Sequence, residues 1–166
     1  MKKRIILLLL IATLISACSK EDKPSDVKFY YPKAEYGYNT DDGAIGYEVR
    51  SNGGIASSAS LLDLYLQGPL EEGLVNPFPE NVSVISLYTL EDTVYVTLSD
   101  SMAELSGAPL ILSCACVCRT AMGLAGTANA QIQCETLLLD GKEFITVNEN
   151  TIFYSDTFHQ TESEVP

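Results

Sequence analysis

The clearest hydrophobic pattern in the chain lies in residues 82–98. Val94, Val96 and Leu98 alternate strictly with other residues, which is the period of a strand with one buried face. The preceding residues are rich in valine, isoleucine, leucine and tyrosine, and Glu91-Asp92 separates the two runs as a tight turn. This segment is therefore predicted to form a β-hairpin.

Two other segments have helical patterns. The first covers residues 57–66, where a serine can cap the amino terminus, leucines form one face, and the following Gly-Pro ends the helix. The second begins near Pro109, which suits the first turn of a helix. It is apolar on nearly all sides from 110 to 124, so we expect a buried helix that ends near Gly126.

Four further runs are rich in β-forming residues and predict strands at 27–32, 45–49, 132–139 and 143–147. Asp140-Gly141 supplies a tight turn between the last two, which predicts a second hairpin. The resulting order, β-β-α-β-β-α-β-β, predicts an α+β fold with a mixed or antiparallel sheet and two helices packed on one face.

Two less regular segments complete the predicted organisation. Residues 70–80 contain two prolines and a glycine, which predicts a loop, and its Leu74, Val75 and Phe78 are expected to reach the core. Residues 151–154 can form one more strand, within an acidic extension at 149–166.

The amino terminus has the layout of an export signal. Three basic residues at 2–4 precede an apolar run at 5–15, which is shorter than the roughly 20 residues of a membrane span. Ile15-Ser16-Ala17-Cys18 resembles the lipobox of bacterial lipoproteins. That resemblance implies cleavage between Ala17 and Cys18 and a diacylglyceryl group on the Cys18 thiol. The alternative is an ordinary signal peptide in which Cys18 has no role.

Removal of residues 1–17 changes the charge of the chain. Seven basic residues then remain against 22 acidic ones, which is a net charge near −15. Such an acidic chain lacks the basic surface that nucleic acid requires and is repelled by anionic lipid. We therefore expect acyl chains on Cys18 to hold the protein at the extracytoplasmic face of the cell membrane. A flexible linker at 18–26 is predicted to join this anchor to a single domain at 27–148.

Five short fragments spread over residues 27–147 resemble one known domain. They are Val27 to Pro32 (VKFYYP), Leu61 to Pro69 (LLDLYLQGP), Phe78 to Val82 (FPENV), Val94 to Ser99 (VYVTLS) and Leu139 to Lys142 (LDGK). Their order and spacing are similar to those of the GerMN domain of bacterial sporulation and germination proteins. Asn81 stands where the family usually has glycine. The segment 114–122 departs from the family by its cysteines, although Thr120 matches the family threonine.

The resemblance implies a fold similar to ring-building modules and a non-enzymatic role. On this basis we expect the domain to assemble with other envelope proteins or with copies of itself, in a setting that includes sporulation or germination. No cofactor is expected apart from the lipid on Cys18.

Cys114, Cys116, Cys118 and Cys134 allow three interpretations. On a helix, Cys114 and Cys118 lie roughly 40° apart, whereas Cys116 points about 200° away from Cys114, so three thiolates cannot converge on a metal. Packing as small core residues is the first interpretation. A disulfide to Cys134 and a metal or redox site are the alternatives.

Other candidate chemistry is sparse, and we predict no catalytic residue. The only histidine, His159, lies in the tail, and no hydrolase, metalloprotease or nucleotide-binding motif occurs. Paired acids at 41–42, 71–72 and 91–92 suit solvated turns, with calcium binding at 39–43 as a sharper alternative. Aromatic residues between Phe29 and Tyr38 are a candidate surface for stacking on sugars. They support an alternative function, a peptidoglycan-binding accessory module that regulates a cell-wall hydrolase.

Overall fold

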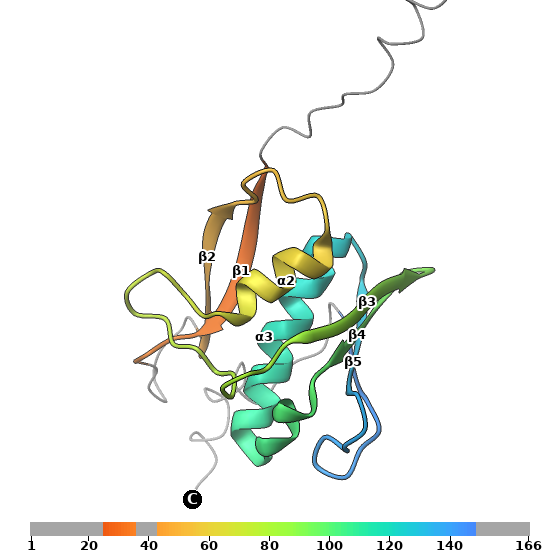
Figure 1. Cartoon of the computed structure of the whole chain (residues 1–166). Coiled ribbons are helices and arrows are strands. Elements are labelled where there is room, and N and C mark those ends of the chain that lie inside the picture. Colours follow the sequence, from red (N-terminus) through yellow and green to blue (C-terminus); the bar gives the residue numbers. More distant parts are fainter. Residues whose placement is uncertain (1–24, 36–42, 149–166) are drawn as a thin grey trace, which may run out of the picture.

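A computed structural model describes residues 25–35 and 43–148 of the chain (Figure 1). The elements follow the predicted order, with one short 3-10 helix added before the second long helix. They are β1 (Asp26–Pro32), β2 (Ile45–Ser51), α2 (Ser58–Leu66), β3 (Val84–Leu90), β4 (Thr93–Leu98), η1 (Asp100–Glu104), α3 (Gly107–Ala125), β5 (Asn129–Cys134) and β6 (Ile145–Asn148).

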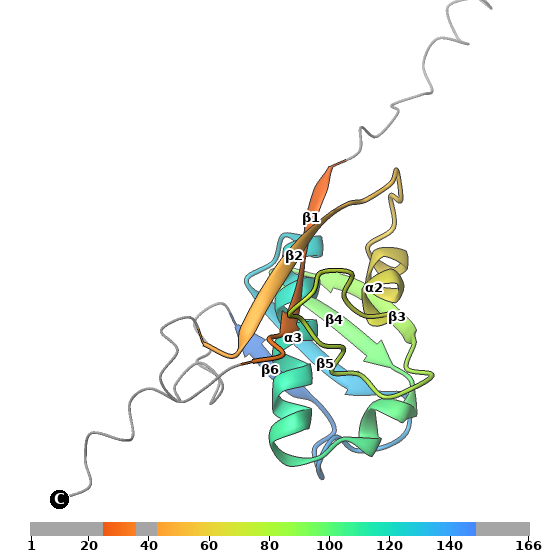
Figure 2. The same ribbon diagram turned by 90° about the vertical axis from the view of Figure 1, so that its left-hand side faces the viewer.

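The six strands form two sheets and confirm the predicted α+β class. β1 and β2 pair as an antiparallel ribbon, and the other four strands form a mixed sheet in the order β3-β4-β5-β6. Within the larger sheet only the β4–β5 pair is parallel. The division into two sheets was not predicted, and it places α3 between them (Figures 1 and 2).

The apolar composition of α3 explains this arrangement. A helix that is apolar on all sides must be covered on more than one side. α3 packs against β1 on one side and against β4 and β5 on the other, and residues 113–118 are buried without interruption. The length and hydropathy of α3 would suit a membrane span, yet here it is the central core helix. It ends at Gly126, whose φ of 68° is the left-handed conformation that glycine adopts readily.

The first helix and the first hairpin form as predicted. The Ser57 hydroxyl accepts a hydrogen bond from the Ser60 amide and caps α2. β3 and β4 pair antiparallel around the turn at Glu91-Asp92, with a register shift between Val84 and Ser86, and the predicted residues of β4 are buried on the inner face. α2 lies beside α3 and contacts β3, so both helices lie on the inner face of the four-stranded sheet.

Two local predictions need correction. β5 ends at Cys134 rather than at 139, because the Asp100 carboxylate accepts the backbone amides of Thr136 and Leu137 and turns the chain away from the sheet. β5 and β6 pair antiparallel, so the predicted second hairpin is present, but residues 135–144 connect its strands and the tight turn at Asp140-Gly141 lies within that connection. In the earlier loop, Leu74 and Phe78 pack on the core as expected, whereas Val75 is exposed. The strand predicted at 151–154 lies outside the described residues.

Candidate functional site

Several predicted site residues lie outside the described part of the chain. These are Ala17 and Cys18 at the expected processing site, most of the acidic turn at 39–43, and His159. The described residues nearest to the predicted anchor are at the start of β1, where the chain enters the domain (Figure 1).

The four remaining cysteines are buried, and none of them forms a disulfide. Cys114 faces Cys134 of β5, whereas Cys116 lies near the hydroxyl groups of Tyr31 and Tyr65. α3 thus presents its thiols to both sheets, as helical spacing requires. Their burial agrees with the core-packing interpretation. Among residues 25–35 and 43–148, no group of three or more potential ligand side chains could hold a metal ion.

Burial also makes these thiols poor nucleophiles. It raises the pKa of Cys114 to about 12 and that of Cys134 to about 11, and it raises the pKa of Cys118 as well. A thiol reacts as its thiolate, and the thiolate is scarce at neutral pH when the pKa is this high. The described cysteines therefore have the properties of packing residues.

The structure places two of the candidate sugar-stacking residues in the core, whereas Tyr36 and Tyr38 lie outside the described residues. Phe29 and Tyr31 are fully buried and pack around Tyr65 of α2, with ring centroids 5.4 and 4.7 Å from that of Tyr65. The cause is the alternation of β1, which turns these two side chains toward α3.

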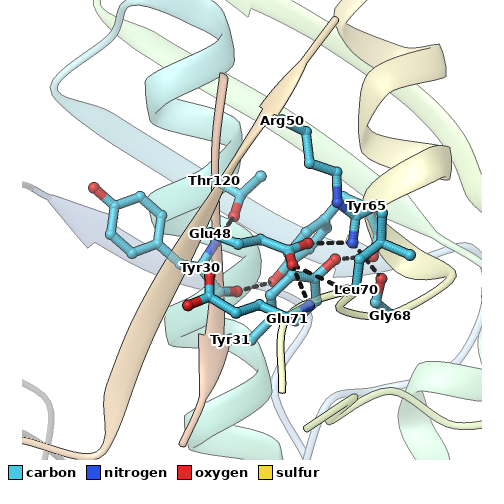
Figure 3. A network of polar contacts seen from close by, with 9 residues as sticks. All are labelled: Tyr30, Tyr31, Glu48, Arg50, Tyr65, Gly68, Leu70, Glu71 and Thr120. Atoms are coloured by element: carbon cyan, nitrogen blue, oxygen red, sulfur yellow. Dashed lines mark hydrogen bonds and ion pairs between the residues drawn. The ribbon is translucent and has the colours of Figure 1, made fainter. Parts of the chain in front are cut away.

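Polar groups of these tyrosines join β1 to both helices (Figure 3). The Tyr31 hydroxyl donates to the Tyr65 carbonyl oxygen at 2.6 Å, and the Tyr65 hydroxyl donates to the Tyr30 carbonyl oxygen at 2.7 Å. The Tyr30 amide in turn donates to the buried Thr120 hydroxyl of α3 at 3.0 Å. Burial raises the pKa of both Tyr31 and Tyr65, so both hydroxyls stay protonated and available as donors.

A buried ion pair between Glu48 and Arg50 lies beside these hydrogen bonds (Figure 3). We call the ion pair and the tyrosine hydrogen bonds together the polar centre. Glu48 is only 4% exposed, and its Oε2 atom accepts the amides of Leu70 and Glu71, each at 2.9 Å. Arg50 donates to the Gly68 carbonyl oxygen at 2.6 Å and lies over the Phe29 ring. Sequence reasoning missed this pair, because its partners are backbone groups about twenty residues further along the chain.

The polar centre is a structural device. Its charges are shielded from solvent, and their contacts with backbone groups hold β2 against the loop after α2. Removal of one partner from such a pair leaves an uncompensated buried charge, which is strongly destabilising. We therefore assign Glu48 and Arg50 to the stability of the fold.

The outer face of the four-stranded sheet, which points away from α2 and α3, is uncharged, unlike the polar centre. No helix lies on that side of the sheet in Figure 1. The register assigns eleven side chains to this outer face, and none of them is charged: Ser86, Tyr88, Leu90, Thr93, Tyr95, Thr97, Asn129, Gln131, Gln133, Thr146 and Asn148. Charged residues occur at its ends, as in the turn at Glu91-Asp92.

The loop at residues 135–144 exposes three large apolar side chains. Leu137, Leu138 and Phe144 are 53%, 52% and 47% exposed, whereas the neighbouring Leu139 is fully buried. The Asp100 carboxylate accepts two amides and the Thr136 hydroxyl at one end of the loop. These bonds hold the pKa of the Asp100 carboxyl below its ordinary value. At the other end, Leu139 and Lys142 exchange two backbone hydrogen bonds. The apolar side chains are thus displayed on an anchored loop.

Comparison with known proteins identifies the family. A family model named Germane, described as "Sporulation and spore germination", matches residues 28–143. The chain belongs to this family. A search of curated proteins gives no match.

Two solved structures are similar to this Germane domain. The tandem GerMN domains of the sporulation protein GerM from Bacillus subtilis match with a TM-score of 0.53 at 14% identity, over 80% of this chain and 49% of that one. The chain thus spans about half of the GerM structure. A Clostridium perfringens protein assigned as a lipoprotein is also similar, with a TM-score of 0.42 at 15% identity, over 81% of this chain and 93% of that one.

Two residues of the predicted family resemblance have clear physical roles in this Germane domain. Asn81 has a φ of 62°, a left-handed conformation that asparagine tolerates better than most residues. Thr120 holds β1 on α3 through its bond to Tyr30.

Two open pockets of the Germane domain lie beside the carboxyl-terminal half of α3. Their volumes are about 400 and 390 Å³. The first contains Asn52, Ile55 and Leu124, and the second contains Tyr30 and Arg119. Neither lining includes a histidine or a cysteine.

Proposed function

We propose that this protein is a lipid-anchored, non-enzymatic docking module of the cell envelope, which binds a partner protein through the loop at residues 135–144, called the docking loop from here on. The sporulation and germination family supplies the setting. The observation that carries the proposal is the display of Leu137, Leu138 and Phe144 on a loop fixed by the Asp100 carboxylate.

The energetics of association support this use of the docking loop. Apolar side chains that stay exposed in a free domain gain free energy when a partner covers them, about 25 cal/mol for each Å² removed from water. A loop that is ordered before binding loses less conformational entropy than a mobile one. Anchored apolar side chains therefore suit a contact that contributes much of the binding energy.

Charge favours a different protein over a second copy as the partner. The mature chain would carry a net charge near −15, since seven basic residues face 22 acidic ones after removal of residues 1–17. Two such chains repel one another, whereas a partner with basic residues around an apolar centre is attracted. Self-association is thus the competing outcome of the test.

The membrane attachment in this proposal rests on the lipobox-like sequence that ends at Cys18. Acyl chains on the Cys18 sulfur would hold the domain at the extracytoplasmic surface, with residues 18–24 as a tether to β1. Metabolic labelling with a radioactive or clickable fatty acid tests this step, and we expect label on the native chain and none on Cys18→Ala.

In-cell photo-crosslinking tests the docking function. A photoreactive amino acid placed at Leu138 should give a crosslink to one protein that mass spectrometry identifies again from position 137. Leu70 is the matched control, because it is an apolar loop side chain with 80% exposure at a site outside the docking loop. Equal crosslinking from Leu70 and Leu138, or none from 137 and 138, would contradict the proposal. Crosslinks only between copies of this chain would establish self-association instead.

A further inference from the structure

We propose that the outer face of the four-stranded sheet binds an uncharged glycan strand, such as the N-acetylhexosamine backbone of a cell wall. This inference goes beyond protein docking and uses a different surface, so each proposal can fail without the other. It does not use the aromatic residues of β1, of which Phe29 and Tyr31 are buried.

Hydrogen-bonding groups on the outer face suit sugars. Asn129, Gln131 and Gln133 place three primary amides in a row along β5, and a primary amide has two N–H donors and an acceptor oxygen. The Asn129 amide already donates one hydrogen bond to the Asp92 carbonyl oxygen at 3.0 Å. The Gln133 amide donates to the Thr97 hydroxyl of β4 at 3.3 Å, which orients both side chains. Sugar hydroxyl and acetamido groups need the same mixture of donors and acceptors.

An aromatic pair lies beside this row of amides. The Tyr88 and Tyr95 rings stack across β3 and β4, with centroids 4.9 Å apart and planes 5° from parallel. Tyr88 remains 54% exposed, so one side of the pair is open to solvent. A tyrosine presents an apolar ring for the C–H face of a sugar together with a hydroxyl group.

The absence of charge distinguishes a glycan from other ligands. A chain with a net charge near −15 and no basic residue on this face would repel an anionic polymer. A typical protein surface carries many charges, and these would lose hydration against the outer face without gaining an ionic partner. A neutral sugar chain incurs neither cost.

The dimensions of the sheet also suit an extended polymer. Four strands spaced about 4.8 Å apart give a platform roughly 14 Å wide, and six-residue strands extend about 20 Å. This area is large enough for several consecutive sugar rings. The exposed location expected for a lipid-anchored domain places such a surface next to the wall.

Sedimentation and calorimetry with the detergent-solubilised full chain test the inference. The chain should sediment with purified insoluble peptidoglycan and should also bind soluble chitohexaose, which contains N-acetylglucosamine and no peptide. Tyr88→Ala and Gln131→Glu should each weaken chitohexaose binding about tenfold, because each removes a predicted contact worth about 1.4 kcal/mol. Gln131→Glu keeps the side-chain shape, so we expect this variant to fold, and a loss of binding can then be assigned to the changed side chain.

Tyr47→Ala is the matched control. Tyr47 is a 51% exposed strand tyrosine that also contacts a tyrosine directly opposite, Tyr30, but it belongs to the two-stranded sheet. Its substitution should leave glycan binding unchanged. The inference is overturned if the native chain binds neither probe, if Tyr47→Ala weakens binding as much as Tyr88→Ala, or if peptidoglycan binds and chitohexaose does not. The last result would assign binding to the peptide part of the wall.

Discussion

The two sheets of this domain use polar side chains in opposite ways. In the two-stranded sheet, Glu48 and Arg50 are shielded from solvent and bonded to backbone groups of the loop after α2. On the outer face of the four-stranded sheet, residues such as Gln131 are uncharged and partly accessible. Charge is thus placed where it stabilises the fold and omitted where we expect a ligand. Burial and bonding partners, rather than residue type, separate the structural polar groups from the candidate binding groups.

The largest expected effect comes from breaking the polar centre. Glu48→Ala removes the acceptor of two loop amides and leaves Arg50 without its buried partner. We expect a loss of about 3–5 kcal/mol in the free energy of unfolding, measured by urea denaturation of the detergent-solubilised protein. Glu71→Ala is the control, because the Glu71 side chain is exposed and only its amide contacts Glu48. Equal effects of the two substitutions would refute the structural role.

Alkaline pH should weaken the same region. The pKa values of Tyr31 and Tyr65 are raised above 10.0 by burial, so the folded state holds these protons more tightly than the unfolded state. Their contribution to stability is complete below pH about 10 and is lost as the pH rises above that value. We expect tyrosinate absorbance from these two residues to appear only together with unfolding. Their titration in a chain that still shows native circular dichroism would contradict the burial of these hydroxyls.

A smaller effect is expected from one hydrogen bond of the polar centre. Tyr65→Phe keeps the ring among Phe29, Tyr31 and Phe78 but removes the donor to the Tyr30 carbonyl oxygen. The free energy of unfolding should fall by about 1 kcal/mol, with a further contribution if the carbonyl is left unpaired. Thermal and chemical denaturation measure this change, and an unchanged stability would show that water replaces the bond without cost.

The smallest effect on stability is expected on the outer face. Gln131→Ala should change the free energy of unfolding by less than about 0.5 kcal/mol, because this side chain supports no buried group. The same substitution should weaken chitohexaose binding. A large loss of stability would make Gln131 a structural residue and would remove the contrast between the two sheets.

Local patterns predicted the individual elements well. The alternation at Val94, Val96 and Leu98 identified the first hairpin, and the continuous apolar run at 110–124 identified the central helix and its buried cysteines. Such features depend on residues close together in sequence, so periodicity and turn chemistry are enough to reveal them.

Contacts between residues far apart in the sequence could not be predicted from local patterns. The division into two sheets depends on which strands meet across α3, and the strand end at Cys134 depends on Asp100, which lies more than thirty residues earlier. The outer face could be recognised only after the register had aligned residues of β3, β4, β5 and β6. The sequence did contain one usable signal, the alternation of uncharged Thr, Gln and Asn in β4 and β5.

Side-chain amide NMR of the detergent-solubilised, 15N-labelled chain tests the contrast between the two sheets most directly. During a titration with chitohexaose, the side-chain amide signals of Asn129, Gln131 and Gln133 should shift together and saturate, while the backbone signals of β2 stay in place. Saturating chitohexaose that leaves these three amides unchanged, or that shifts β2 instead, would contradict the assignment of the outer face as the glycan-binding surface.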